Sequence, residues 1–240
     1  MYKRQGYDIY MKDNANELSE QRIVKSLDSF REIEGRLLAK NKITKVLIGG
    51  SPYDETSKFN NFILHQKNNA ILKIIDAQRV SAKKNGWGFV DFNEPMRKIS
   101  LEEQKRDSTF TFCRVDRIHP DNDGQMVMAY LFLKAQGLAG YEVSEFSIDA
   151  QHLDVIVHKN CKISKLKRGK KNLTFDYLAY ALPYPLDSIP RHGWGNMKSQ
   201  RDAMQLVPFM KEFNQERFQV HNLEKGIYQL TIDDLSLIHI

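Results

Sequence analysis

Residues 112–124 read FCRVDRIHPDNDG, and the apolar run at 125–137 follows directly. Asp116 and His119 lie three residues apart in a polar loop, and Pro120 with the Asx-rich residues 121–123 predicts the start of a helix. Near physiological pH a neutral imidazole can take a proton from a hydroxyl, while a neighbouring carboxylate holds its tautomer and stabilises the imidazolium that forms. The stretch therefore predicts a general base, His119, that Asp116 orients.

Two short apolar segments precede this loop. Residues 43–49 contain the continuous run Val46-Leu47-Ile48, and residues 88–92 read GFVDF. A continuous apolar run predicts a strand that is covered on both faces, as in a parallel sheet. Strand, helix, strand, loop and helix is the order of a doubly wound α/β sheet, whose sites form outside the carboxyl ends of the strands. Residues 51–54 and 91–94 are expected at that edge, beside the loop of Asp116 and His119.

The helices of this half are expected from apolar residues that recur at intervals of three and four. Helices are predicted at 18–38, at 61–84, where Gly86 follows as a stop signal, and at 123–136, where Gly137 does the same. A loop through Pro95 and a helical turn at 100–105 are expected between the second strand and the polar loop.

The block DxxHP before a helix resembles the last conserved block of the SGNH (GDSL-like) hydrolases, which are serine esterases and acylhydrolases. The segments VLIGGSPYD at 46–54 and GFVDF at 88–92 look like the last two core strands of that family, so the resemblance covers Gly6 to about Gly140. It implies a flavodoxin-like doubly wound parallel sheet in three α/β/α layers, with its amino-terminal part missing. It also implies that Asp116 and His119 complete a triad with a serine in a GDS motif.

The chain contains no GDS motif, and it lacks the glycine block and the GxND asparagine that build the family's oxyanion hole. Residues 1–5 and 235–240 resemble translations of a transposase end sequence that serves as a sequencing adapter, although ordinary irregular chain ends are an alternative. We therefore expect residues 6–234 to be an internal piece of a longer reading frame. On this interpretation the nucleophile and the oxyanion donors lie outside the chain.

The pattern changes after Gly140. Residues 153–158, 173–177, 218–220 and 227–232 predict strands, and turn signals such as Arg168-Gly169 separate them. Residues 141–234 are thus expected to form an incomplete β-rich appendage of the small-sandwich kind, and a similar extension occurs in some larger bacterial members of the family that the chain resembles. Two features stand out in it: a dense basic segment at 162–171, and Trp194 between glycines, which either stacks on a sugar as a substrate contact or anchors a buried loop.

Composition limits the function classes. A 240-residue chain with 41% hydrophobic and 28% charged residues is typical of a globular protein, and its formal net charge of +6 does not require nucleic acid as a partner. No apolar run approaches a membrane span, and two cysteines make no disulfide framework. No cofactor or metal is expected. The sequence fixes neither the cellular compartment nor the oligomeric state. The family resemblance favours a location outside the cytoplasm.

Other chemistries have weaker signals. A metal site would need other histidines to join Asp116 and His119, but no HxH, HxxxH or CxxC spacing is present. Cys113 is expected to be packed in the interior and not to act as a nucleophile. Ser51 is not expected to be a nucleophile either, because Pro52 follows it and a proline has no N–H to donate to an oxyanion hole. Asp121, Asn122 and Asp123 are expected to cap the helix, and Arg114 and Arg117 to be solvent-exposed.

The sequence thus predicts a carboxylic-ester hydrolase that acts on a small-molecule or carbohydrate ester, with acetyl groups on carbohydrate as a possible substrate. The alternative is a non-catalytic carbohydrate-binding or adhesive protein on a hydrolase-like scaffold, in which the β-rich half does the binding.

Overall fold

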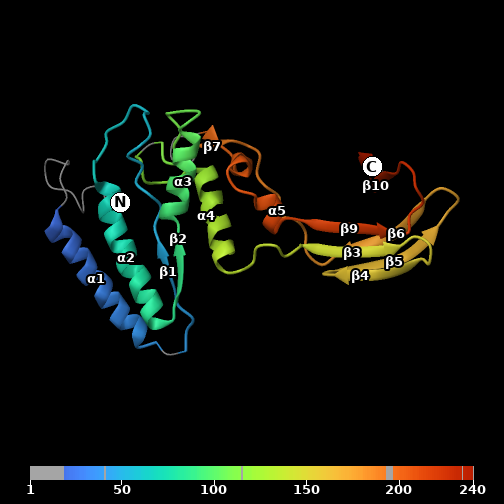
Figure 1. Ribbon diagram of the computed structural model, residues 1–240, viewed down its shortest axis with the longest axis horizontal. Helices are drawn as coiled ribbons and strands as arrows, with labels where there is room; N and C mark the ends of the chain where they lie inside the picture. Colours follow the sequence, from blue (N-terminus) through green and yellow to red (C-terminus); the bar gives the residue numbers. More distant parts are fainter. Residues whose placement is uncertain (1–18, 41, 115, 193–196, 234, 240) are drawn as a thin grey trace. The chain divides into compact units, whose positions relative to one another are not determined.

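The computed structural model describes residues 19–40, 42–114, 116–192, 197–233 and 235–239 (Figure 1). The chain divides into two compact units: unit 1 runs to Ala139 and includes Pro185–Phe209, and unit 2 is Gly140–Tyr184 with Met210–Ile240. The sequence placed a boundary near residue 140, where the first division lies. The expected appendage at 141–234 is interrupted, however, because residues 185–209 belong to unit 1.

Unit 1 is a mixed α/β unit around a parallel pair of strands. β1 (Val46–Gly49) pairs with β2 (Gly88–Asp91) in a register that joins Val46 to Gly88 and Gly49 to Asp91. α1 (Glu20–Leu38) precedes β1, and α2 (Lys67–Asn85) connects the two strands. α3 (Asn93–Glu103) and α4 (Asn122–Ala135) follow β2. The two strands and the helix between them are therefore present as the sequence predicted.

Helices pack against both strands on one side but only partly on the other. Phe30 of α1, Leu47 of β1 and Ala82 of α2 form one buried cluster, which Phe89 of β2 extends. α4 packs against β2, and Figure 1 shows α2 and α4 on opposite sides of the strand pair. Val46 and Ile48 of β1 are 44% and 43% exposed. The expectation that β1 is covered on both faces is therefore wrong: among the described strands, β1 pairs with β2 alone.

Two helix boundaries differ from the predicted ones for local reasons. α2 begins at Lys67 and not at residue 61, because Gln66 has a left-handed backbone and the N–H of Leu64 is bonded to the hydroxyl of Tyr53 at 3.0 Å. α3 begins at Asn93, where a loop was expected. Pro95 lies in its first turn, where backbone N–H groups have no intrahelical acceptor, so a proline costs the helix no hydrogen bond.

α4 starts close to the loop before it. The N–H of Asp121 donates to the carbonyl of Phe112 at 2.8 Å. A Cβ at Gly124 would lie 2.7 Å from the Cβ of Pro120 and 3.1 Å from that of Phe112. Real Cβ atoms do not approach a proline ring so closely, so a glycine here lets the helix pack directly on the loop that carries His119.

Unit 2 is a small β-sandwich. Its first sheet has the order β4-β3-β9, with β3 (Ser144–Asp149) antiparallel to β4 (Asp154–Lys159) and parallel to β9 (Glu216–His221). The second sheet is the antiparallel hairpin of β5 (Cys161–Arg168) and β6 (Leu173–Ala179). Side chains from both sheets share one core around Phe146 and Ile148, which includes Phe175, Tyr177 and Phe218.

The remaining elements are short. Unit 1 contains β7 (Arg191–His192), β8 (Met197–Lys198) and the 3₁₀ helix η1 (Gln200–Gln205), which packs against α4. α5 (Phe209–Phe213) spans the boundary between the units, and β10 (Gln229–Ile232) pairs with β11 (Leu235–His239). Strands at four predicted places are confirmed as β4, β6, β9 and β10, whereas β3 and β5 were not predicted. Within the described ranges, no helix is long and apolar enough to cross a membrane.

Candidate active site

The side chain of Asp116 is held by its own loop and holds His119 in turn. One carboxylate oxygen, Oδ1, accepts the backbone N–H groups of Ile118 and His119 at 3.0 and 2.9 Å. The other, Oδ2, lies 2.5 Å from Nδ1 of His119. Because a carboxylate only accepts, this geometry assigns the imidazole proton to Nδ1 and the lone pair to Nε2. The structure therefore brings the two predicted residues into contact as an orienter and a base would be arranged.

Exposure fits the same arrangement. The side chain of Asp116 is 15% exposed, whereas that of His119 is 45% exposed. A partly exposed imidazole on a sheltered carboxylate can reach a substrate while its orientation stays fixed. Their catalytic roles remain predictions.

Arg117, between these two residues, is fully buried, at 0% exposure. Its guanidinium donates to four backbone carbonyls of the preceding loop, at 2.9, 3.1, 3.0 and 3.3 Å: those of Asp54, Ser57, Phe59 and Asn61. The guanidinium also lies 4.1 Å from the ring centroid of Phe59. The expectation that Arg117 is solvent-exposed is therefore wrong, because a planar group with five donors can satisfy a whole loop of carbonyls that turns around it. Arg114, by contrast, is exposed.

The backbone of Arg117 strengthens this link. Its φ of +64° lies in the left-handed region, and its carbonyl accepts the N–H of Asp54 at 2.7 Å. Ser51 donates its hydroxyl to the carbonyl of Ile118 at 3.2 Å. Ile118 also packs against the buried cluster of Tyr53 and Leu64. The loop after β1 and the loop of Asp116 and His119 are thus joined at several points, which fixes the pair relative to the sheet.

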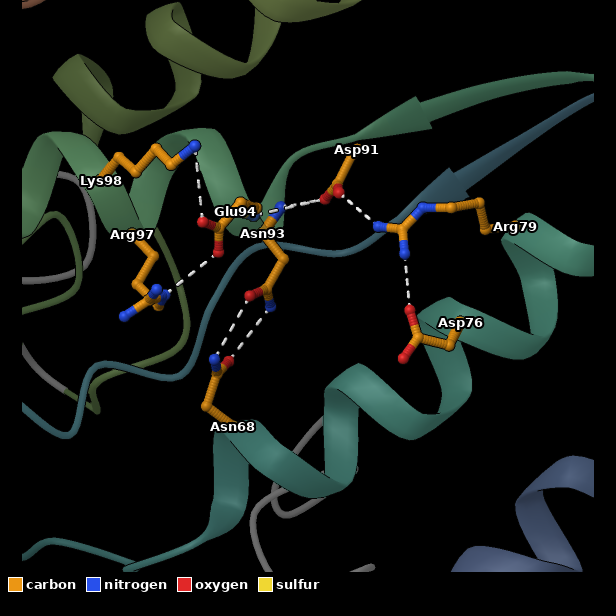
Figure 2. Close-up of polar contacts among 8 residues, drawn as sticks. All are labelled: Asn68, Asp76, Arg79, Asp91, Asn93, Glu94, Arg97 and Lys98. Atoms are coloured by element: carbon orange, nitrogen blue, oxygen red, sulfur yellow. Dashed lines mark hydrogen bonds and ion pairs between the residues drawn. The ribbon is translucent and has the colours of Figure 1, made fainter.

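The carboxyl end of β2 is organised by a separate polar network (Figure 2). Asp91 accepts the N–H groups of Asn93 and Glu94 at 2.9 and 3.3 Å and pairs with Arg79 at 2.7 Å, so it anchors the start of α3. The side chains of Asn68 and Asn93 donate to each other at 3.2 and 3.1 Å and join α2 to α3. These groups have structural partners, so the network acts as a rigid mount for the loops beside it.

A cavity of about 370 Å³ lies over this network. Its lining includes Tyr53 from the loop after β1, Asn68 from α2, and Glu94 with Arg97 from α3. Neither side chain of the pair at 116 and 119 is part of that lining. The cavity therefore lies at the carboxyl ends of the two strands, and the imidazole of His119 does not line it.

The residues that were expected to cap α4 act in different ways. Asp121 occupies the N-cap position, but its side chain makes no capping hydrogen bond. Asp123 accepts the N–H of Gly124 at 2.8 Å. Asn122 donates to the carbonyls of Arg191 and Lys198 at 3.4 and 3.0 Å. Capping by all three side chains is therefore wrong, because Asn122 instead ties β7 and β8 to the helix start.

Trp194, which follows β7 in the sequence, lies outside the described residues. Its predicted contact with substrate therefore stays a prediction.

Two candidate nucleophiles near the Asp116 and His119 loop, Cys113 and Ser51, are poorly placed for attack. Burial, and then the nearby carboxylate of Asp54, raise the pKa of the Cys113 thiol well above its ordinary value, so the thiolate is disfavoured. The hydroxyl of Ser51 donates its hydrogen bond to the backbone carbonyl of Ile118. Among the described residues, no three His, Cys, Asp or Glu side chains gather as metal ligands would.

A second pair with the same spacing occurs in unit 2. Asp149 accepts the N–H groups of Gln151 and His152 at 2.8 and 2.9 Å and lies 3.1 Å from Nδ1 of His152. The N–H of His152 is the main cause that holds the pKa of Asp149 well below its usual range. The sequence interpretation missed this pair, although DAQH repeats the spacing of DRIH. The D-x-x-H turn is therefore a local structure, and what distinguishes Asp116 and His119 is their position beside the parallel strands.

Comparison with known proteins gives one informative result. No protein-family model matches the chain, and no curated protein matches it. The chain is similar to the solved structure of a gut microbial diltiazem-metabolizing enzyme, with 47% sequence identity and a TM-score of 0.85. The match covers 98% of this chain and 53% of that enzyme, so the chain spans about half of the enzyme's length. The chain therefore has the fold of one part of an enzyme.

The buried role of Arg117 generates a direct test. Arg117→Met should lower the free energy of unfolding by about 3 kcal/mol or more, because it removes the guanidinium donor from three buried carbonyls and one partly buried carbonyl. The matched control is Arg114→Met, which removes an exposed arginine and should change stability by less than about 0.5 kcal/mol. Urea unfolding followed by circular dichroism measures both, and equal effects of the two substitutions would contradict the assignment.

Asp123 should make stability depend on pH. Burial is the main cause that raises its pKa from 3.8 to about 6. The folded state therefore binds this proton more tightly than the unfolded chain, and the resulting stability is present below pH 3.8 and is lost as the pH rises through about 6. A shift of about two units corresponds to about 3 kcal/mol at most.

The variant Asp123→Asn removes this titration, so its stability relative to the parent should rise between pH 4 and pH 7.5 in thermal unfolding scans. Asp107→Asn is the control, because hydrogen bonds from Thr109 lower the pKa of Asp107 below 3.8, so the stability of this variant relative to the parent should stay nearly constant over this range. If the difference between Asp123→Asn and the parent is constant over this range, burial does not raise this pKa.

Proposed function

We propose that this chain is the part of an SGNH-type serine esterase that supplies the base and the orienting acid of a Ser-His-Asp triad. The observation that carries the proposal is the 2.5 Å contact between Nδ1 of His119 and Asp116, in a loop fixed beside the parallel strands. The similarity to part of an enzyme supports a catalytic protein and not a purely binding one.

In the proposed mechanism a serine hydroxyl attacks the acyl carbonyl of an ester. Nε2 of His119 takes the hydroxyl proton and later gives it to the leaving alcohol, while Asp116 holds the imidazole and stabilises its charged form. A water molecule then attacks the acyl-serine with the same base. The sequence has neither the glycine block nor the GxND asparagine of the family, whose oxyanion donors act together with the nucleophile.

The serine is proposed to lie in sequence that joins this chain in the intact enzyme. Support comes from the matched enzyme, of which this chain covers 53%. Among the described strands β1 is paired on one edge only, and Val46 and Ile48 are exposed on one face, so a further strand and a covering helix of a three-layer flavodoxin-like sheet would find room there. On this proposal the chain alone is nearly inactive, because loss of the nucleophile alone costs about 10⁶-fold in kcat.

The proposed substrates are esters of small molecules or carbohydrates, including acetyl esters. The name of the matched protein, a diltiazem-metabolizing enzyme, says that this relative acts on a small organic molecule. A carbohydrate ester is proposed as well, because the family resemblance implies one. The acyl and alcohol groups are not fixed by any side chain described here.

A chimera tests the proposal without knowledge of the missing sequence. This chain would replace the matching part of the diltiazem-metabolizing enzyme, and the product should metabolise diltiazem and hydrolyse p-nitrophenyl acetate. His119→Ala should lower kcat by about 10⁴-fold or more, and Asp116→Asn by about 10³- to 10⁴-fold. KM should change little, since both residues act on the transition state.

The chain provides its own controls. His152→Ala removes the imidazole of the second D-x-x-H pair and should leave kcat within about twofold, because that pair lies in the sandwich. The chain by itself should show no hydrolysis above background. A chimera that works equally well with His119→Ala, or one that is folded and inactive, would contradict the proposal.

A further inference from the structure

Most of the chain's net charge is concentrated in one hairpin. Residues 161–179 contain one acid, Asp176, and six basic residues: Lys162, Lys165, Lys167, Arg168, Lys170 and Lys171. This segment therefore carries +5 of the chain's formal net charge of +6. The rest of the chain is nearly neutral, so the hairpin is a local source of positive potential.

The fold turns these cations outward. β5 and β6 pair antiparallel, with Lys162 opposite Leu178 and Lys167 opposite Thr174. Ile163 and Leu166 of β5 and Phe175 of β6 pack into the sandwich core instead. All six basic residues are exposed, and the register shift between Ser164 and Lys167 lets Lys165 and Lys167 both face solvent.

Most of these cations have no counter-ion within the described residues. Lys165 pairs with Asp176 at 2.7 Å, and Arg168 pairs with Glu224 at 2.8 Å. No ion pair is formed in the described part of the chain by four lysines: Lys162, Lys167, Lys170 and Lys171. Their mutual repulsion costs free energy in the free protein, and a polyanion laid along the hairpin would relieve it.

We propose that the outward face and tip of the β5–β6 hairpin bind an acidic polysaccharide. Five of the six cations are lysines, which act as point charges on flexible stems and suit a polymer that carries carboxylates or sulfates at intervals. This binding is independent of the proposed ester hydrolysis, because it uses no residue of the Asp116 and His119 loop.

Other polyanions fit the hairpin less well. The tip, Gly169 to Asn172, presents only small or polar residues and has no apolar side chain to insert into a lipid surface. Base stacking needs exposed aromatic rings, but the aromatic rings within the hairpin, Phe175 and Tyr177, belong to the sandwich core. Within residues 161–179, nucleic acid binding therefore lacks an exposed aromatic ring, and membrane binding lacks an apolar side chain at the tip.

The test uses the whole chain and polygalacturonate, which carries one carboxylate per sugar. Calorimetric titration at low salt should detect binding to polygalacturonate and none to neutral dextran. A variant with Lys162→Glu, Lys167→Glu, Lys170→Glu and Lys171→Glu should bind at least about tenfold more weakly, and binding by the parent should weaken as salt rises. A second variant with glutamine at the same positions should lose affinity in the same direction.

The control makes the same charge change on unit 1, at four other exposed lysines: Lys25, Lys58, Lys83 and Lys84. This control should keep its affinity within about threefold, because these lysines are not on the hairpin. If the hairpin and control variants lose affinity for polygalacturonate equally, the loss is explained by net charge alone and the proposal is overturned. It is also overturned if the parent does not bind polygalacturonate, or binds a DNA oligonucleotide or phosphatidylserine vesicles more tightly.

Discussion

The buried guanidinium of Arg117 is the interaction on which the geometry of the candidate site depends. It donates to four backbone carbonyls of residues 54–61, and three of them, those of Asp54, Ser57 and Phe59, are buried and would lose this donor without it. Because Arg117 stands between Asp116 and His119, the same interaction fixes the backbone on which both side chains are mounted. The left-handed φ of Arg117 persists because the surrounding contacts hold it.

The two D-x-x-H pairs show which features of the candidate site come from local structure and which come from tertiary structure. In both, one carboxylate oxygen accepts two backbone N–H groups and the other contacts Nδ1 of the histidine. The turn therefore forms the pair wherever the spacing occurs. Only His119 is joined to loops at the carboxyl ends of parallel strands, where doubly wound folds place their sites. Tertiary position, and not pair geometry, supports the proposed role.

The sequence predicted the features that depend on local pattern. The apolar runs predicted β1 and β2, and the spacing of Asp116 and His119 predicted their contact. It failed where distant groups decide: Arg117 is buried because remote carbonyls surround it, and Val46 and Ile48 are exposed because no described element fully covers their face of β1. β5 was missed because its outward lysines hide the inward apolar residues. No local signal could have revealed the burial of Arg117.

The central claim is that Asp116 fixes His119 as a neutral base with its lone pair on Nε2. The direct measurement is long-range ¹H–¹⁵N NMR of the histidine rings in the chain as it stands, with His119 assigned by its absence in His119→Ala. Neutral His119 should show the Nδ1–H tautomer, and Asp116→Ala should remove that preference. An Nε2–H tautomer, or a spectrum unchanged by Asp116→Ala, would contradict the account.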